Sequence, residues 1–477
     1  MSQIHIETLG CRLNQIESEA AARFFTDYNF SVSMEGLSSS SESDNETLIG
    51  IINTCTVTQK AEQKARRLLR LMLKKFPSAV IIVTGCYAQL AEKEIQAIDP
   101  RICVIGGQMK SRISKLPQLL SENKKEKEWD PCAFIKIIKE NVTAQPQLKP
   151  GFPENSFTLA ATSFLSHSRA SLKIQDGCNN NCSFCAIHIA RGHSVSLEVQ
   201  TAIDRVRELE EKGHDEVVLT SVNIGQYKAE YQGKYINFTQ LLALLLEKTN
   251  KIHFRISSLY PDVVDDDFCR VIANERVQPH FHISVQSGSS RILDLMNRPY
   301  SSQSVIDACQ RLNKAKKNPF LACDIITGFP GESDEDFSDT ISLCKKCNFA
   351  WVHAFPYSER PGTAAITMKN KVPQSVSGQR AKEISEWAVI QKIDYVKNFI
   401  GTEHEAVLET VKRPLALAAG AKAGRIIYHA VTDNFIHCEI ISEKQIEANK
   451  MIKIRITDVL SDKIKKGGDI EAAAEFV

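Results

Sequence analysis

The sequence predicts an α/β protein made of three folded parts: an amino-terminal open parallel α/β domain, a central partial (β/α) barrel and a carboxy-terminal small antiparallel β-barrel. Three observations predict this division. Apolar strands alternate with helical segments over residues 1–110, and the same alternation returns over residues 168–400. Residues 401–475 form short alternating strands joined by turns, the pattern of a small barrel. Residues 111–167 are polar and contain prolines, which indicates a linker with some strand content.

The 477-residue chain has the composition of an ordinary globular protein, with 43% hydrophobic and 24% charged residues. Its 59 Lys and Arg residues nearly balance its 57 Asp and Glu residues, so the formal net charge is +2. This balance excludes a globally basic nucleic-acid coat but leaves room for a local basic face. The 14 cysteines are too sparse for a disulfide scaffold, and their role becomes the main question.

The amino terminus lacks the basic stretch and apolar core of a secretory signal. The longest apolar runs are far shorter than the roughly 18 residues that a membrane span needs. We therefore expect a cytoplasmic protein without membrane contact. Thiols stay reduced in the cytoplasm, so grouped cysteines there are expected to bind metal or to take part in chemistry.

Each of three predicted strands in the amino-terminal domain is followed by a cysteine and then by a helical segment. The strands cover 4–10, 49–53 and 79–85, and the cysteines are Cys11, Cys55 and Cys86. Open parallel sheets bind their ligands at the carboxyl ends of the strands. The three cysteines are therefore candidates for one site that would exist only in the folded chain.

A second group of cysteines lies on the short polar loop QDGCNNNCSFC, which follows the predicted strand SLKIQ. Cys178, Cys182 and Cys185 have the spacing C-x3-C-x2-C. Thiolates are the ligands that iron–sulfur clusters select, and three of them leave one iron of a cubane free to bind a small molecule. The alternative is a structural zinc knuckle with His188 or His193 as the fourth ligand.

This loop, with an aromatic residue before its last cysteine, resembles the signature of the radical S-adenosylmethionine (SAM) superfamily. The segments TLGCRLNQIESE, INTCTVT and VTGCYAQ around the other three cysteines resemble the cysteine motifs of the methylthiotransferase family. The resemblance continues at HFHISVQSGSSRILDLMNR, DIITGFPGES and FPYSERPGTAA, and the tail resembles the TRAM module, an RNA-binding barrel. The resemblance covers nearly the whole chain.

The resemblance implies two 4Fe–4S clusters, and SAM both as methyl donor and as the source of a radical that removes a hydrogen atom. The implied ligands are Cys178, Cys182 and Cys185 for the radical SAM cluster and Cys11, Cys55 and Cys86 for the auxiliary cluster. Gln286 and Asp324 stand at predicted strand ends facing the implied SAM pocket, although each could equally be a structural hydrogen-bonding residue. No catalytic residue is expected beyond the cluster cysteines.

Family resemblance also indicates a substrate. The strings TLGCRLNQIESE, KIQDGCNN and RISSLYPD are most similar to the branch that adds a methylthio group to C2 of N6-threonylcarbamoyladenosine at position 37 of tRNA. The alternatives are isopentenyladenosine in tRNA and an aspartate of a ribosomal protein. The implied partners are the anticodon stem-loop of tRNA and a low-potential electron donor such as flavodoxin or ferredoxin. Outside enzymes, the alternatives are an iron–sulfur redox protein and an RNA-binding protein without SAM chemistry.

The sequence departs from the family pattern at two places. The family's Ser-Arg pair is Ser196-Leu197 here, and its Leu-Thr-Gly ends in Ser221. These differences put any SAM or substrate contact at Leu197 and Ser221 in doubt.

Several other features have plainer interpretations. We expect the remaining cysteines, including the Cys344-x2-Cys347 pair, to be core or surface residues, and His280 and His282 to line a core or pocket. The helix predicted over 58–76 is rich in Lys and Arg, and basic residues recur in the tail. Either could contact RNA phosphates, although a charged run is more often only a solvated face. The tail residues are Lys412, Arg413, Lys422, Arg425, Lys450, Lys453 and Arg455.

Overall fold

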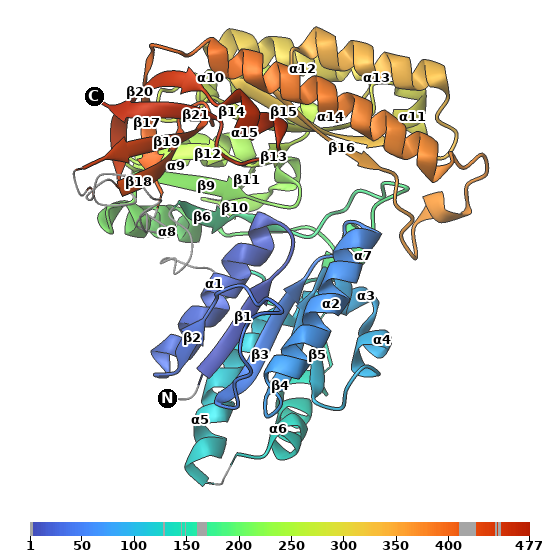
Figure 1. Cartoon of the computed structure of the whole chain (residues 1–477), viewed down its shortest axis with the longest axis vertical. Coiled ribbons are helices and arrows are strands. Elements are labelled where there is room, and N and C mark those ends of the chain that lie inside the picture. Colours follow the sequence, from blue (N-terminus) through green and yellow to red (C-terminus); the bar gives the residue numbers. More distant parts are fainter. Residues whose placement is uncertain are drawn as a thin grey trace.

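The computed structural model has the three predicted parts (Figure 1). It describes residues 3–126, 129–144, 146–147, 149–159, 169–409, 426–443, 446 and 450–477. The amino-terminal domain, blue to cyan in Figure 1, lies below the central domain, which runs from green to orange. The carboxy-terminal barrel, in red, packs against one side of the central domain.

The amino-terminal domain is an open sheet of parallel strands in the order β2-β1-β3-β4-β5. The strands are β1 (Gln3–Thr8), β2 (Ser31–Ser33), β3 (Thr47–Thr54), β4 (Val80–Gly85) and β5 (Ile102–Gly106). Every residue of β3 and β4 is buried, because helices cover both faces of the sheet. The helices that alternate with the strands are α1 (Arg12–Asp27), α2 (Gln59–Lys75), α3 (Cys86–Leu90) and α4 (Glu92–Gln96). The predicted strand–loop–helix units are confirmed.

The first part of the segment expected to be a linker, up to Val142, is largely helical and contributes to the core of the amino-terminal domain. It contains α5 (Leu116–Glu126) and α6 (Pro131–Ile138), and its described residues up to 159 include no strand. Phe134 and Ile138 are one helical turn apart, so α6 buries one apolar face against the sheet. Asp130 caps α6 by accepting a hydrogen bond from a backbone N–H, with a proline as its first residue. The capping residue Asp130 therefore favours a helix in this segment, although its apolar residues alone had suggested a strand.

The central domain is an arc of parallel strands, which confirms the partial (β/α) barrel. The first sheet is β12-β9-β6 and the second is β13-β14-β15-β16, and β13 begins two residues after β12 ends. The strands are β6 (Ala170–Lys173), β9 (Glu216–Thr220), β12 (His253–Ile256), β13 (Ser258–Leu259), β14 (His280–Gln286), β15 (Phe320–Thr327) and β16 (Trp351–Pro356). All of their pairings are parallel, so their carboxyl ends open on the same side.

Helices of the central domain cover the outside of the arc. They are α8 (Val199–Glu211), α9 (Phe238–Lys248), α10 (Asp266–Ile272), α11 (Ser290–Leu295), α12 (Ser302–Ala315), α13 (Asp334–Cys347) and α14 (Gln374–Lys397). Capping boxes start α9, α12 and α13, at Asn237, Ser301 and Ser333. One apolar core runs between these helices and the strands.

The carboxy-terminal part is a closed barrel in the order β17-β18-β19-β21-β20, as expected for a TRAM-like module. Its strands are β17 (Glu403–Leu408), β18 (Ile426–Thr432), β19 (His437–Ser442), β20 (Met451–Val459) and β21 (Ala472–Phe476). All pairings are antiparallel except that of β19 with β21. Among the described residues of the chain, no helix combines the length and apolarity needed to cross a membrane.

Candidate functional site: two cysteine triads beside one cavity

The three amino-terminal cysteines come together at the carboxyl edge of the open sheet. The register of β3 with β4 pairs Thr54 with Gly85, so Cys55 and Cys86 follow neighbouring positions on adjacent strands. Cys11 is the N-cap residue of α1, just beyond the end of β1. Burial, together with the nearby thiols of Cys86 and Cys11, raises the pKa of Cys55 to about 11. We call these three residues the amino-terminal triad.

Two glycines permit this close approach. Gly10 and Gly85 immediately precede two of the cysteines and have φ values of +107° and +97°. A Cβ atom on Gly10 would lie 2.7 Å from the Cβ of Cys55, and one on Gly85 would lie 2.3 Å from the carbonyl oxygen of Thr54. Any residue with a side chain would be strained at these φ values and would push the triad apart.

The surroundings of the amino-terminal triad suit an anionic, sulfide-rich ligand. Burial raises the pKa of Cys86, whereas the positive charges of Arg191 and Lys110 oppose this rise. The buried hydroxyls of Thr8 and Thr84 have no hydrogen-bond partner among the described residues. A buried hydroxyl without a partner is costly, so a ligand that accepts hydrogen bonds would relieve this cost.

The second group, which we call the loop triad, follows the short strand β7 (Gln175–Asp176) and precedes α7 (Ile187–Arg191). Its members are Cys178, Cys182 and Cys185. Burial, together with the two other thiols of the triad, raises the pKa of Cys185 to about 12. A buried thiol of this kind ionises when a metal centre neutralises its charge.

Each sulfur atom of the loop triad accepts a hydrogen bond from a nitrogen donor. The contacts are the backbone N–H of Asn180 to Cys178 (3.4 Å), the backbone N–H of Ile187 to Cys185 (3.4 Å) and Nη1 of Arg298 to Cys182 (3.2 Å). Arg298 is held in place by the hydroxyls of Tyr260 and Tyr300, at 2.8 and 2.7 Å. Donors that point at sulfur favour the thiolate form, which is the form that binds iron.

Neither triad is arranged to share one metal ion. Within the described residues, no group of three or more His, Cys, Asp or Glu side chains converges closely enough to hold an ion. Thiolates that bind different irons of a cubane stand further apart than ligands of a single ion. His193, a candidate ligand in the zinc alternative, instead pairs with Asn179 Oδ1 at 3.2 Å. Three thiolates are the donors that an iron–sulfur cubane selects, and they leave one of its irons open.

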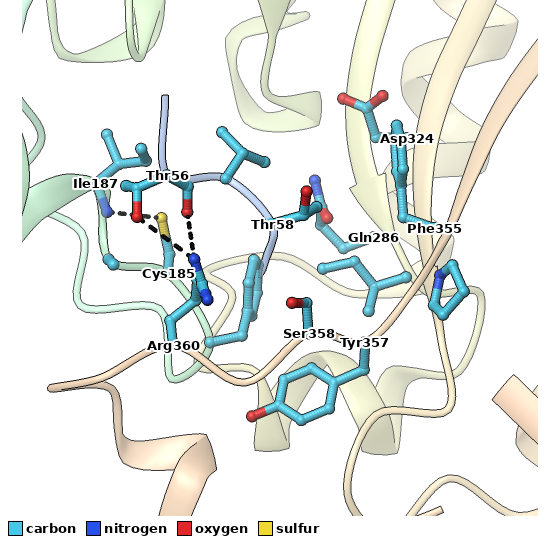
Figure 2. Close-up of a pocket in the computed structure, with 15 residues that line it drawn as sticks. Thr56, Thr58, Cys185, Ile187, Gln286, Asp324, Phe355, Tyr357, Ser358 and Arg360 are labelled. Carbon is cyan, nitrogen blue, oxygen red and sulfur yellow. Dashed lines mark hydrogen bonds between the residues drawn. The ribbon is translucent and has the colours of Figure 1, made fainter. Parts of the chain in front are cut away.

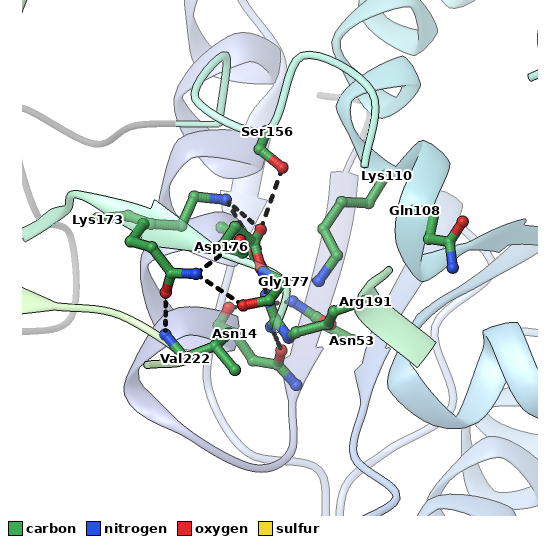
Figure 3. Close-up of polar contacts among 12 residues, drawn as sticks. Asn14, Asn53, Gln108, Lys110, Ser156, Lys173, Asp176, Gly177, Arg191 and Val222 are labelled. Carbon is green, nitrogen blue, oxygen red and sulfur yellow. Dashed lines mark hydrogen bonds and ion pairs between the residues drawn. The ribbon is translucent and has the colours of Figure 1, made fainter. Parts of the chain in front are cut away.

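A buried ion network lies between the segments that carry the two triads, and Figure 3 shows its members Lys110, Lys173, Asp176 and Arg191. Glu17 of α1 is only 1% exposed and accepts hydrogen bonds from Lys110 (2.5 Å), Lys173 (3.0 Å) and Arg191 (3.3 Å). Arg191 also binds Asp176, two residues before the loop triad, at 2.7 Å. Burial alone would raise the pKa of Glu17, but its cationic neighbours lower it to about 2. The network thus stays ionised and ties the two domains together.

Asn14 extends this network to the backbone around the amino-terminal triad. Nη2 of Arg191 donates to Oδ1 of Asn14 at 2.9 Å. Nδ2 of Asn14 donates in turn to the carbonyl oxygens of Leu9 (2.8 Å) and Thr54 (3.2 Å). Leu9 and Thr54 lie within two residues of Cys11 and Cys55, so one side chain fixes the loops that carry both cysteines.

A second junction joins the domains on the other side of Cys55. Nη1 of Arg360 donates to the carbonyl oxygen of Thr56 at 3.0 Å and to Glu62 at 2.7 Å. The backbone N–H of Gln59 donates to the hydroxyl of Ser358 at 3.1 Å. The loop after β16 is thereby fastened to the start of α2.

A cavity of about 300 Å³ lies beside Cys185 of the loop triad and beside the segment that follows Cys55 (Figure 2). Residues 56–58, directly after Cys55, form one wall, and residues 184–187, which include Cys185, form another. The ends of β14, β15 and β16 complete it. Val57 and Phe355 form an apolar rim, because their side chains are 60% and 44% exposed. The cavity is of the size that small ligands occupy.

Gln286 and Asp324 both line this cavity. Gln286 ends β14 with a φ of +74°, an uncommon backbone conformation for a residue with a side chain and one that clusters at functional sites. His282 contacts Asp324 at 3.0 Å. Burial alone would raise the pKa of Asp324, but His282 lowers it overall, so the side chain is a carboxylate. Both side chains can accept hydrogen bonds from a ligand.

Two family descriptions match the chain. Residues 3–107 match "Uncharacterized protein family UPF0004" and residues 172–344 match "Radical SAM superfamily". A protein of Treponema pallidum (strain Nichols) named "Threonylcarbamoyladenosine tRNA methylthiotransferase MtaB" is 40% identical, over 96% of this chain and 98% of the relative. A protein of the same name from Rickettsia prowazekii (strain Madrid E) is 35% identical over 85% and 87%. A "tRNA-2-methylthio-N(6)-dimethylallyladenosine synthase" from Histophilus somni (strain 129Pt) is 28% identical over 97% and 91%.

The chain belongs to the methylthiotransferase family of radical SAM enzymes. The predicted family is thereby confirmed, and with it SAM and a 4Fe–4S cluster as cofactors. In this radical SAM methylthiotransferase, the loop triad lies inside the matched radical SAM segment and the amino-terminal triad inside the other matched segment.

Leu197 and Ser221, the two residues that depart from the family pattern, lie within the fold of this methylthiotransferase. Leu197 is buried in the core, and its carbonyl oxygen accepts a hydrogen bond from Tyr227 at 2.7 Å. The hydroxyl of Ser221 is buried and has no hydrogen-bond partner among the described residues. Neither residue lines the cavity described above.

The remaining features of the methylthiotransferase are mostly structural. His280 is buried, and burial holds its pKa well below the ordinary value. Cys344 and Cys347 are buried in the same apolar core as Cys309 and Cys323, as expected for core residues. Of the basic tail residues, Lys412, Arg413, Lys422 and Arg425 lie outside the described residues, and Arg455 pairs with Glu403 at 2.7 Å.

Sequence reasoning missed Arg191 and Arg360, which hold the two domains together, and Arg298, which binds Cys182 of the loop triad. Arg191, Arg298 and Arg360 lie inside or beside the quoted family segments, which was the only sign available. Glu17 lies within the quoted segment TLGCRLNQIESE, but its partners Lys110, Lys173 and Arg191 do not. Their partners are far away in the sequence, so only the fold identifies them.

Proposed function

We propose that this enzyme adds a methylthio group to C2 of N6-threonylcarbamoyladenosine at position 37 of tRNA. The observation that carries the proposal is the cavity between Cys185 of the loop triad and the segment that follows Cys55, with an apolar rim formed by Val57 and Phe355. Two relatives that carry the threonylcarbamoyladenosine name are 40% and 35% identical, whereas two named for dimethylallyladenosine are 28% and 29% identical. These sequence identities favour threonylcarbamoyladenosine over dimethylallyladenosine as the substrate.

In this proposal the loop triad and the amino-terminal triad each hold a 4Fe–4S cluster. When bound, the clusters and SAM supply one-electron chemistry: cleavage of SAM to a radical that takes a hydrogen atom, and a sulfur that is methylated and transferred. The protein orients the reactants and excludes water. Gln286 and Asp324 accept hydrogen bonds from SAM in the cavity, and the Arg191 network fixes the position of one triad relative to the other.

Reduction requires a low-potential electron donor, which we propose to be flavodoxin or ferredoxin. RNA reaches the cavity through its anticodon stem-loop, because the adenosine at position 37 lies beside the anticodon. An unpaired loop base can leave its stack at small cost and enter a pocket, where aromatic side chains can stack on it.

Iron and sulfide counting after anoxic purification tests the cofactors. The proposal requires about eight irons per chain, as two cubanes. Replacing Cys178, Cys182 and Cys185 together with Ala should remove about half of the iron and all reductive cleavage of SAM. The matched variant, with Cys11, Cys55 and Cys86 replaced by Ala, should also lose about half of the iron but still cleave SAM. Cleavage that survives the first substitution set would contradict the radical assignment.

Mass spectrometry of tRNA nucleosides tests the substrate. Cells that lack this gene should lose methylthio-threonylcarbamoyladenosine and retain its unmodified precursor. Loss of methylthio-isopentenyladenosine instead would assign the enzyme to the other tRNA branch. If all tRNA nucleosides were unchanged and a ribosomal aspartate lost its methylthio group, the tRNA proposal would fail.

A further inference from the structure

Helix α2 of the amino-terminal domain carries a concentration of positive charge that the rest of the chain does not share. Its 17 residues contain seven Lys or Arg residues and one acid, Glu62, although the whole chain has a formal net charge of only +2. A local excess of this kind attracts polyanions, whatever the overall balance of charge.

Most of these cations lie on the outer face of the helix. Ala65, Leu69, Met72 and Leu73 are buried against the sheet. Lys60, Arg67 and Lys74 are seven residues apart, which places them in one line on the side opposite the buried residues. Lys64 and Arg70 flank this line, and all five side chains are exposed. We call these five residues the basic stripe, which spans about 21 Å at 1.5 Å per residue.

The basic stripe has no acidic partner among the described residues, since none of its members takes part in an ion pair there. The two other cations of the helix are engaged: Arg66 donates to the hydroxyl of Tyr87 and Lys75 to the carbonyl oxygen of Ser41. Glu62, the one acid, is held by Arg360 at 2.7 Å. An uncompensated row of like charges costs stability through self-repulsion, which favours an anionic partner.

The basic stripe starts at the cavity. Thr58 is the N-cap residue of α2 and lines the cavity, and Lys60 follows two residues later. Val57 directly precedes this N-cap residue, and Phe355 lines the same cavity as Thr58 (Figure 2). In Figure 1, α2 extends from this junction down the outer side of the amino-terminal domain. A strand whose base enters the cavity therefore has its backbone close to α2.

We propose that the basic stripe on α2 binds the phosphate backbone of the RNA whose adenosine enters the cavity. This inference rests on the proposed function, because it takes RNA as the substrate. A regular line of flexible cations, continuous with the cavity rim, suits a polymer that carries one negative charge per nucleotide. An acidic redox protein is the other class of partner that such a surface could attract, and the experiment distinguishes the two.

The test compares three forms of the cluster-loaded, full-length protein. The stripe variant carries Lys60→Gln, Arg67→Gln and Lys74→Gln. The control variant removes three exposed cations from the central domain, with Lys314→Gln, Lys317→Gln and Lys345→Gln. The probe is a synthetic RNA hairpin with an anticodon stem-loop sequence, and its binding is measured by fluorescence anisotropy at several salt concentrations.

The stripe variant should bind the hairpin at least about tenfold more weakly at low salt, and its slope of log K against log salt should fall by about 2 to 3. The control variant should match the wild type. Iron content and SAM cleavage without RNA should be the same in all three, which shows that the substitutions leave the fold and the radical chemistry intact.

Four results would overturn the inference. Equal hairpin affinity and equal salt slope in the stripe variant and the wild type would show that α2 does not touch RNA. Unchanged RNA binding with slower reduction by flavodoxin would assign the stripe to an acidic redox protein. An equal loss in the control variant would show a general effect of charge. If the wild type itself bound no hairpin, the proposed tRNA substrate would fail along with the inference.

Discussion

Arg191 of the central domain and Asn14 of the amino-terminal domain form a hydrogen bond 2.9 Å long across the interface, although 177 residues separate them. The same guanidinium binds Asp176 beside the loop triad. Asn14 holds the carbonyl oxygens of Leu9 and Thr54 near the amino-terminal triad. Two side chains therefore connect the loops of both triads, and the relative position of the triads depends on them.

Loss of Arg191 should destabilise the protein strongly. In Arg191→Met, the buried carboxylates of Glu17 and Asp176 lose a shared cation and keep only Lys110 and Lys173, and breaking a buried ion pair by removing one partner costs about 3–5 kcal/mol. The first unfolding transition in urea measures this cost. Arg270→Met is the matched control, because Arg270 and its partner Asp267 are exposed, and it should cost less than about 1 kcal/mol. Equal effects of the two substitutions would show that the network does not stabilise the interface.

Arg360 and Glu62 should be energetically coupled. Their contact of 2.7 Å is almost fully buried and fastens the loop after β16 to α2. A double-mutant cycle with Arg360→Gln and Glu62→Gln should give a coupling energy of about 1–3 kcal/mol in thermal or urea unfolding. Strictly additive effects would mean that the two residues act independently. Iron content, measured on the same samples, would show whether the junction also protects the nearby triad.

Phe355 should contribute to substrate affinity rather than to SAM cleavage. Its ring lines the cavity and is 44% exposed, so it can stack on a base at the rim. Stacking of a base on an aromatic ring is worth about 1–3 kcal/mol, so Phe355→Ala should raise KM for the RNA by roughly 5- to 150-fold. Phe355→Tyr keeps the ring and should restore affinity. An unchanged KM in the Ala variant would remove the rim from the RNA-binding surface.

The ion pair of Glu216 and Arg255 should make stability fall in acid. Burial alone would raise the pKa of Glu216, but Arg255 and Arg169 lower it below its ordinary value. A carboxylate with a lowered pKa stabilises the fold above its unfolded pKa of about 4.3. This stabilisation is lost as the pH falls through the pKa that Glu216 has in the folded protein.

Urea unfolding of the cluster-free chain between about pH 7 and about pH 3 measures this dependence. Wild type should be more stable than Glu216→Gln near neutral pH, and the difference should shrink in acid. In acid, Glu216 of the wild type becomes protonated and neutral, like the Gln of the variant. Arg255 then has no carboxylate to bind at 2.9 and 2.7 Å in either protein. A difference that stayed constant with pH would contradict the ionised pair.

Much of the fold could be predicted because local patterns determine it. The apolar strands, the caps and the helical spacing identify β1, β3 and β4 and the central arc. Prediction was weaker over 111–167, where the short apolar run of α6 resembles a strand until its capping residue Asp130 is considered. Short apolar runs are ambiguous in this way because strand and helix differ in periodicity, which few residues can reveal.

The sequence by itself determined the cysteines and their order on the strands, because thiol spacing within a loop and positions after strand ends are local properties. Only the tertiary structure decided what surrounds them: the cavity between Cys185 and the segment that follows Cys55, the contact of Arg360 with Glu62, and the network around Arg191. These contacts join residues from different domains, so their energy depends on burial and on distances that no local pattern encodes. For the same reason the basic stripe could be noticed in the sequence as a run of charge, whereas its place at the cavity rim required the fold.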